Sequence, residues 1–161
     1  MRVATQDRVH AMTLILSCLT PKYIVQVSDR RLTWPDGRVE DDAANKVVVF
    51  HERASFCYTG LAQIGAQRTD EWIADQLIGC TGLQNAIDTL KHALDERIAR
   101  LRVVNRHLTI GIDFWGTEDP TQPDRPWSIA LTNQIDPATR KYSSVPRVTF
   151  DQFNQVLPAG M

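Results

Sequence analysis

Thr13 is the residue of this chain whose type and position point most directly to chemistry. It follows Met12 and opens an apolar run over residues 14–19. A threonine hydroxyl becomes a nucleophile when a base takes its proton, and the α-amine of the same residue can be that base if it is free. Removal of one methionine would free this amine if translation starts at Met12. The sequence therefore indicates a candidate hydrolase with an N-terminal nucleophile.

Short apolar runs predict the strands that would position this residue. The predicted strands cover residues 14–19, 23–27, 46–50, 54–59, 108–115 and 127–135. Their length and β-branched content are typical of strands, and the first four runs predict two hairpins. The near-continuous apolar content of these early runs predicts strands that are buried on both faces.

Two helices are predicted between the early and the late strands. Apolar residues within 62–79 suggest the first, and apolar residues repeat at intervals of three and four through 83–101 to indicate the second. Thr81 and Gln84 fit a capping box at the start of the second helix. Strands, two consecutive helices and further strands predict an α+β fold, in which two sheets face each other and the helix pair covers one outer face.

Composition excludes several function classes. A chain of 161 residues with 43% hydrophobic and 23% charged residues is typical of a soluble single domain. A formal net charge of −1 gives no electrostatic reason to bind nucleic acid or an anionic membrane, and no run is long enough to span a bilayer. The three cysteines are scattered, which favours a reducing, cytoplasmic compartment. No metal and no cofactor are expected.

A set of residues with fixed spacing resembles a known family. These residues are, in order, Thr13, Asp29-x-Arg31-x-Thr33, Lys46 and Gly60. The pattern is similar to that of proteasome β subunits and their bacterial relatives, which are N-terminal-nucleophile (Ntn) hydrolases with a four-layer αββα sandwich. The spacing matches without a gap up to Thr33, and one inserted residue before Lys46 brings Gly60 into register. The resemblance covers about residues 13–135 and is most specific over the first fifty.

The resemblance implies a catalytic role for four residues. Thr13 would attack a carbonyl carbon to form an acyl-enzyme, with its α-amine as base, through a water. Lys46 would stay cationic beside the hydroxyl and favour its deprotonation. Asp29 would be the counter-charge that a sheltered ammonium requires. The backbone N–H of Gly60 would point at the developing oxyanion.

The resemblance also implies a substrate-binding role for five residues. Arg31 and Thr33 would support the site, and the backbone of Thr33 would hold an extended substrate strand. Leu32, Tyr58 and Ala62 would adjoin the pocket that accepts the residue before the cleaved bond. Their apolar character predicts a hydrophobic preference.

Two functions follow from this pattern. The first is a threonine-dependent peptidase or amidohydrolase that acts on peptide or protein substrates as a homo-oligomeric ring; the resemblance also allows an ATP-dependent unfoldase as a partner. The alternative is a catalytically inactive structural or interaction subunit of the same fold, in which Thr13 is never unmasked. Each position also has a structural interpretation by itself: a charged strand end for Asp29, a solvated strand start for Lys46, and backbone freedom for Gly60.

The chain also departs from the family. Met12 stands where self-processed members have glycine, so residues 1–12 are interpreted as an N-terminal extension, either a propeptide or a misassigned start. Residues 13–161 are interpreted as one domain that lacks the last helices and strands of the family and is apparently truncated at its C-terminus. Nothing in 142–161 reproduces the serine and the aspartate–serine pair that support the nucleophile in the family.

Overall fold

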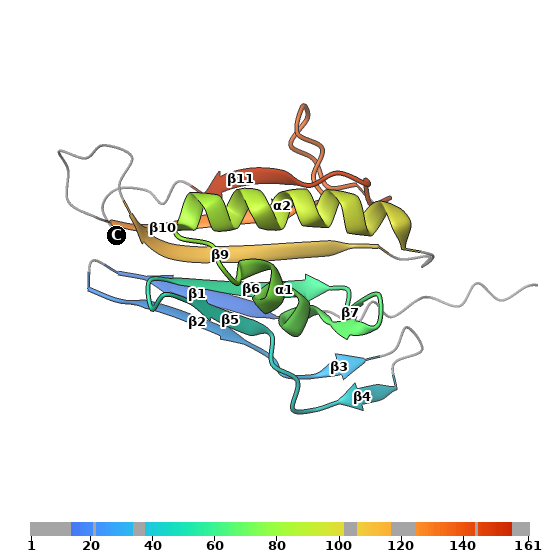
Figure 1. Cartoon of the computed structure of the whole chain (residues 1–161), viewed down its shortest axis with the longest axis horizontal. Coiled ribbons are helices and arrows are strands. Elements are labelled where there is room, and N and C mark those ends of the chain that lie inside the picture. The colour runs from blue at the N-terminus through green and yellow to red at the C-terminus, as the bar shows by residue number, and fades with distance from the viewer. Residues whose placement is uncertain are drawn as a thin grey trace, which may run out of the picture.

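A computed structural model describes residues 14–20, 22–33, 38–101, 106–116, 125–143 and 145–155. The elements, in chain order, are β1 (Ile15–Leu19), β2 (Ile24–Ser28), β3 (Leu32–Thr33), β4 (Val39–Asp41), β5 (Val47–Phe50), β6 (Ala54–Gly60), β7 (Gln63–Ile64), β8 (Gln67–Arg68), α1 (Thr69–Leu77), α2 (Leu83–Arg100), β9 (Leu108–Gly116), β10 (Arg125–Thr132) and β11 (Asp151–Gln155). Two helices among antiparallel strands agree with the predicted α+β class (Figure 1).

A five-stranded antiparallel sheet forms the centre of the molecule. Its order is β11-β10-β9-β6-β5, and the β5–β6 hairpin confirms one predicted pairing. The turn of this hairpin uses positive φ angles at His51 and Glu52, which few residues other than glycine adopt. The central strands β6 and β9 carry buried or half-buried side chains on both faces, as predicted for β6.

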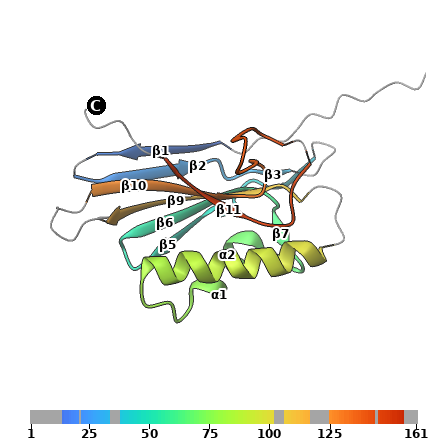
Figure 2. The ribbon, with the colours of Figure 1, turned by 90° about the horizontal axis from the view of Figure 1, so that it is seen from above.

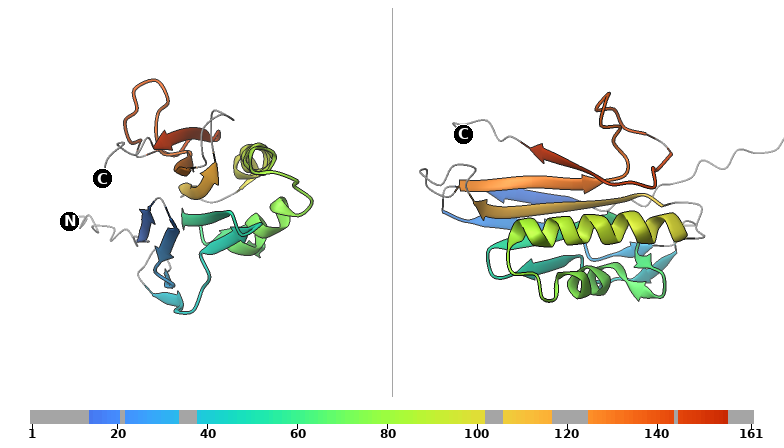
Figure 3. Two further views of the ribbon diagram at one scale, coloured as in Figure 1. Left: turned by 90° about the vertical axis from the view of Figure 1, so that its left-hand side faces the viewer. Right: turned by 45° about the horizontal axis from the view of Figure 1, so that its top comes forward.

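The two helices cover one face of this sheet (Figure 3). Successive strand residues point to opposite faces, and the alternate residues Phe56 and Tyr58 of β6 join the core beneath the helices. The predicted three- and four-residue period of α2 is confirmed, because its buried residues are Ala86, Ile87, Leu90, Leu94 and Ile98. Burial of one such aliphatic side chain contributes roughly 1.5–3 kcal/mol, so this interface is a large part of the fold's stability.

The β1–β2 hairpin lies on the opposite face of the sheet (Figures 2 and 3). The predicted pairing is confirmed, with Leu16 opposite Val27. The prediction that these strands are buried on both faces is wrong, because Leu16 is 57% and Val27 55% exposed. The described residues thus form a helix layer, a five-stranded sheet and a two-stranded hairpin.

The first helix lies within the predicted range 62–79, and one local prediction about the second helix is wrong. The first helix begins at Thr69, because residues 63–68 form the small β7–β8 hairpin, with Gly65 at φ +72° in its turn. The capping box does not form: Gly82 is the N-cap residue of α2, and no side chain caps it. Neither described helix combines the length and apolar character needed to cross a membrane.

The last strands also differ from the prediction. β10 ends at Thr132, because the side chain of Asn133 turns to the backbone: its amide nitrogen donates to the carbonyls of Arg106 (2.8 Å) and Arg147 (3.1 Å). Its amide oxygen accepts the N–H of Leu108 at 3.1 Å. β11 is absent from the prediction, and it pairs with β10 at the edge of the sheet.

A buried polar contact joins the hairpin to the sheet. Gln26 of β2 donates its Nε2–H to Oδ2 of Asp113 of β9 at 2.8 Å, and Asp113 is only 1% exposed. Within the described part of the chain, Oδ1 of Asp113 and Oε1 of Gln26 are buried without a hydrogen-bond partner. Unpaired buried acceptors destabilise a fold by about 1–3 kcal/mol each.

We expect Asp113→Asn to stabilise the protein by about 1–2 kcal/mol in urea unfolding at pH 7, because the new amide supplies a donor and removes a buried charge. The matched control is Asp75→Asn, since Asp75 accepts a hydrogen bond from Gln67 in the same way at an exposed position (2.7 Å). That control should change stability by less than about 0.5 kcal/mol. A destabilised Asp113→Asn protein would contradict this expectation, because it would mean that the buried carboxylate makes stabilising contacts that the amide cannot replace.

Candidate active site

Lys46 is the buried cation of this molecule's candidate site. It directly precedes β5, where its carbonyl accepts the N–H of Tyr58 at 3.2 Å and extends the strand pairing by one residue. Its side chain is 1% exposed, and Nζ donates to both carboxylate oxygens of Asp29 at 3.3 Å and to the carbonyl of Arg31 at 2.6 Å. The interpretation of Lys46 as a solvated strand start is therefore wrong. A buried ammonium requires such partners to remain charged.

Asp29 connects this ammonium to the start of β1. It follows the last residue of β2, and its N–H donates to the carbonyl of Leu14 at 3.1 Å. The N–H of Leu14 in turn donates to Oδ1 of Asp29 at 3.0 Å. One carboxylate oxygen thus accepts hydrogen bonds from the buried ammonium and from the residue that follows Thr13 in the chain. Thr13 itself lies outside the described residues.

The arginines beside Asp29 act mainly on the backbone around Lys46. Arg30 donates to the carbonyls of Ala43 (2.5 Å) and Ala44 (3.4 Å), which fixes the segment before Lys46 against the end of β2. Arg31 accepts the Lys46 ammonium through its carbonyl, while its guanidinium pairs with Asp42 at 2.9 Å. That pair is more than half exposed and contributes little to stability. Asp29, Arg30, Arg31 and Asp42 line a shallow depression.

Gly60 ends β6 at the same end of the sheet. Tyr58 of β6 lies opposite Lys46. Gly60 lies two residues beyond Tyr58 on β6, about 7 Å further along the strand at the usual rise per residue. Its φ is +109°, and a Cβ there would lie 2.0 Å from the carbonyl oxygen of His107. The next residue, Leu61, donates its N–H to the same carbonyl at 3.0 Å. The need for glycine at position 60 is therefore structural.

The residues expected to adjoin the substrate pocket differ in exposure. Leu32 (9% exposed) and Tyr58 (1% exposed) are buried, and Ala62 is half-buried, its carbonyl accepting the N–H of Thr69 at 3.0 Å. The Tyr58 hydroxyl donates to the carbonyl of Asn45 at 3.4 Å. Burial, and next the Asp70 charge, raise the pKa of Tyr58 above its ordinary value, so the phenol stays neutral. Thr33 is the last residue of β3.

Several contacts of this site had no signal in the sequence. The carbonyl of Arg31 and the N–H of Leu14 are backbone groups, which residue types do not reveal. The side chain of Asn45 bonds to both backbone groups of Val47, at 2.9 and 3.2 Å, and so blocks part of the free edge of β5. Arg68 at the entry to α1 pairs with Asp41 (3.4 Å) and Asp70 (3.1 Å), which ties β4 to the start of the helix.

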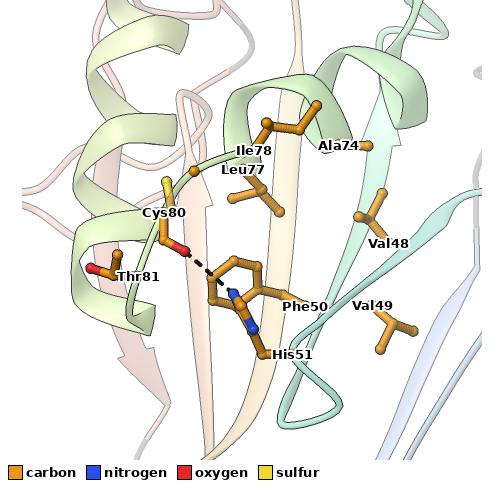
Figure 4. Close-up of a pocket in the computed structure, with 10 residues that line it drawn as sticks. Val48, Val49, Phe50, His51, Ala74, Leu77, Ile78, Cys80 and Thr81 are labelled. Atoms are coloured by element: carbon orange, nitrogen blue, oxygen red, sulfur yellow. Dashed lines mark hydrogen bonds between the residues drawn. The ribbon is translucent and has the colours of Figure 1, made fainter.

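A second depression lies between the ends of β5 and α1 (Figure 4). Its lining is mainly apolar, with Phe50 and Leu77 among the contributing residues. The ring Nε2 of His51 donates to the carbonyl of Cys80 at 3.3 Å, and the Cys80 thiol faces the carbonyl of Gln76 at 3.6 Å. Because both groups bond to backbone carbonyls, this depression presents no nucleophile paired with a base.

The residues that the structure describes include no group of three or more histidine, cysteine or acidic side chains that could hold a metal ion. Comparisons of the chain with protein-family models, with curated proteins and with solved structures give no match. Function is therefore inferred from the residues of the Asp29–Lys46 site and their geometry.

We expect Gly60→Ala to destabilise the protein by about 3 kcal/mol or more, because a methyl group would overlap the His107 carbonyl at a strained φ. Gly79→Ala is the matched control, since Gly79 also has a positive φ (+80°) but no atom within 4 Å of the added methyl. It should lose only about 1 kcal/mol. Equal losses of unfolding free energy in the two variants would contradict the close approach at Gly60.

A double-mutant cycle tests the buried ion pair. Asp29→Asn leaves the buried ammonium without its counter-charge and should lower the free energy of unfolding by about 2–3 kcal/mol. This loss is smaller than for a fully buried pair, because the Asp29 side chain is about one-third exposed (35%). Lys46→Met should cost less, since Asp29 keeps the Leu14 N–H and solvent as partners. In the Lys46→Met background, Asp29→Asn should then have little effect. The control cycle at Arg31 and Asp42 should give a coupling below about 1 kcal/mol, and strictly additive effects at Asp29 and Lys46 would contradict the pair.

Proposed function

We propose that the chain is a threonine-dependent peptidase or amidohydrolase, in which Thr13 becomes the N-terminal nucleophile after removal of Met12. The observation that supports this proposal most strongly is the shared carboxylate of Asp29. It accepts the Lys46 ammonium at 3.3 Å and the Leu14 N–H at 3.0 Å. Because the nitrogen of Leu14 is bonded to the carbonyl carbon of Thr13, this geometry favours a cation held close to the proposed nucleophile.

The proposed reaction uses this cation and a free α-amine. The Thr13 hydroxyl attacks the substrate carbonyl carbon while its proton passes to the α-amine through a water. The α-amine titrates near 8, so an appreciable fraction is free base at neutral pH. The resulting ammonium then protonates the leaving amine, and a water hydrolyses the acyl ester to regenerate the hydroxyl. Lys46 would stabilise the developing alkoxide, and the N–H of Gly60 the tetrahedral oxyanion.

The fold and assembly belong to the same proposal. The helix layer, the five-stranded sheet and the opposed hairpin would be part of a four-layer αββα Ntn sandwich. The buried Leu32 and Tyr58, with Ala62, would favour an apolar residue before the cleaved bond. Subunits would form a homo-oligomeric ring in the cytoplasm, and an ATP-dependent unfoldase would be a suitable partner for protein substrates.

A catalytically inactive interaction subunit of the same fold is the second candidate. It is favoured by the exposed apolar side chains of the β1–β2 hairpin, including Leu16 and Val27. In such a subunit Thr13 would stay within the chain, and the Asp29–Lys46 pair would serve only to hold β1 and β5 together.

Mass spectrometry of the mature N-terminus and peptide hydrolysis separate these candidates. A chain expressed from Met12 should begin at Thr13 and hydrolyse fluorogenic peptides with an apolar residue before the cleaved bond. Thr13→Ala should lower kcat/KM by about 1,000-fold or more, whereas Thr13→Ser keeps a hydroxyl and should retain part of the activity. Equal hydrolysis by the Thr13→Ala protein would reject the nucleophile. A protein expressed from its native start that keeps the residues before Thr13 and hydrolyses no peptide or amide would favour the inactive subunit.

A further inference from the structure

The free edge of β5 is closed at one residue and open two residues later. Tyr58 donates its N–H to the carbonyl of Lys46, and in an antiparallel pair only alternate residues turn both backbone groups to the partner strand. The N–H and the carbonyl of Val47 and of Val49 therefore point outward. The side chain of Asn45 binds both outward groups of Val47, at 3.2 and 2.9 Å. Within the described part of the chain, the outward groups of Val49 have no such partner.

This open position adjoins the apolar depression at the ends of β5 and α1, which we call the β5–α1 groove (Figure 4). Val49 lines it on one side, and Ala74, Leu77 and Ile78 line it on the other. The volume of the groove is about 630 Å³, which is within the usual range of ligand sites. None of its lining residues is acidic, a lysine or an arginine. A charged side chain in the groove would therefore be without a counter-charge.

The open edge and the groove together select an extended polypeptide segment. A residue of an added strand can exchange two hydrogen bonds with Val49, which a small apolar molecule cannot do. Because successive side chains alternate, the residue opposite Val49 points away from the helices, as Val49 itself does. Its two neighbours lie opposite Val48 and Phe50, whose side chains pack against the core beneath the helices. Both neighbours therefore point toward the β5–α1 groove.

We propose that the β5–α1 groove docks an extended segment of another protein, which adds one short strand to the edge of β5. The segment carries uncharged, apolar residues at two positions separated by one residue. The Asn45 side chain ends the pairing at Val47, which keeps the added strand short. Lys46, just before β5, and Phe50, its last residue, are about 13 Å apart at the usual rise per residue. The groove is thus separate from the Asp29–Lys46 site, and this inference does not depend on the proposed peptidase chemistry.

NMR titration of the full chain with a blocked peptide tests the docking. The probe is acetyl-Lys-Thr-Leu-Thr-Leu-Thr-Lys-amide, and its control is the isomer with adjacent leucines, acetyl-Lys-Thr-Thr-Leu-Leu-Thr-Lys-amide. The probe should shift the amide signals of Val49 and Ile78 and leave those of Leu14 and Asp29 unchanged. The isomer can place only one leucine in the groove, so it should bind about tenfold more weakly. No shift at Val49, equal affinity of the two peptides, or shifts centred on Leu14 and Asp29 would overturn the proposal.

Two variants assign the binding to the strand edge and to the groove. Val49→Pro removes the outward N–H, and edge strands tolerate proline where the N–H faces solvent. Ile78→Lys places a charge in the groove at a side chain that is 77% exposed, so its result decides the outcome where Val49→Pro fails to fold. Each variant should weaken the probe about tenfold, whereas Val145→Lys, at an exposed position outside the groove, should bind it as the wild type does. Unchanged affinity in the Ile78→Lys protein, or a peptide-free dimer that Val49→Pro dissociates, would overturn the proposal.

Discussion

The buried ammonium of Lys46 is the constraint on which the candidate site depends. A cation with 1% exposure is stable only where the fold supplies acceptors. Here they come from the residues that follow β2: the carboxylate of Asp29 and the carbonyl of Arg31. The start of β1, the end of β2 and the start of β5 are therefore held together by one charged centre. Because Asp29 also binds the N–H of Leu14, the same centre orients the strand that follows the proposed nucleophile.

The layered fold accounts for the rigidity of this centre. Lys46 enters β5, which pairs with β6 in the central sheet, and the helix layer packs beneath β6. Gly60, at the end of β6, is locked against the carbonyl of His107. The opposite side of the site is less constrained, because the hairpin contacts the sheet through few groups, among them the Gln26–Asp113 hydrogen bond.

The sequence predicted features that depend on strong periodicity, and it failed where local groups compete. The period of α2 and both early hairpins are confirmed, since apolar spacing largely determines them. The capping box at Thr81 is wrong because Gly82 takes the N-cap position. The exposure of Val25 and Val27 was not predictable, because an apolar run does not reveal whether another layer packs on each face of the strand. At the site, residue types indicated Asp29 and Lys46, but no residue type reveals a backbone acceptor.

NMR of the Lys46 side chain tests the central geometry most directly. Both the Lys46 Nζ and the Leu14 nitrogen lie within 3.3 Å of the same Asp29 oxygen. We therefore expect an ammonium signal from Lys46 that exchanges slowly with water and a nuclear Overhauser contact between its protons and the Leu14 amide proton. A Lys46 ammonium that exchanges as fast as an exposed lysine, with no contact to Leu14, would contradict the account.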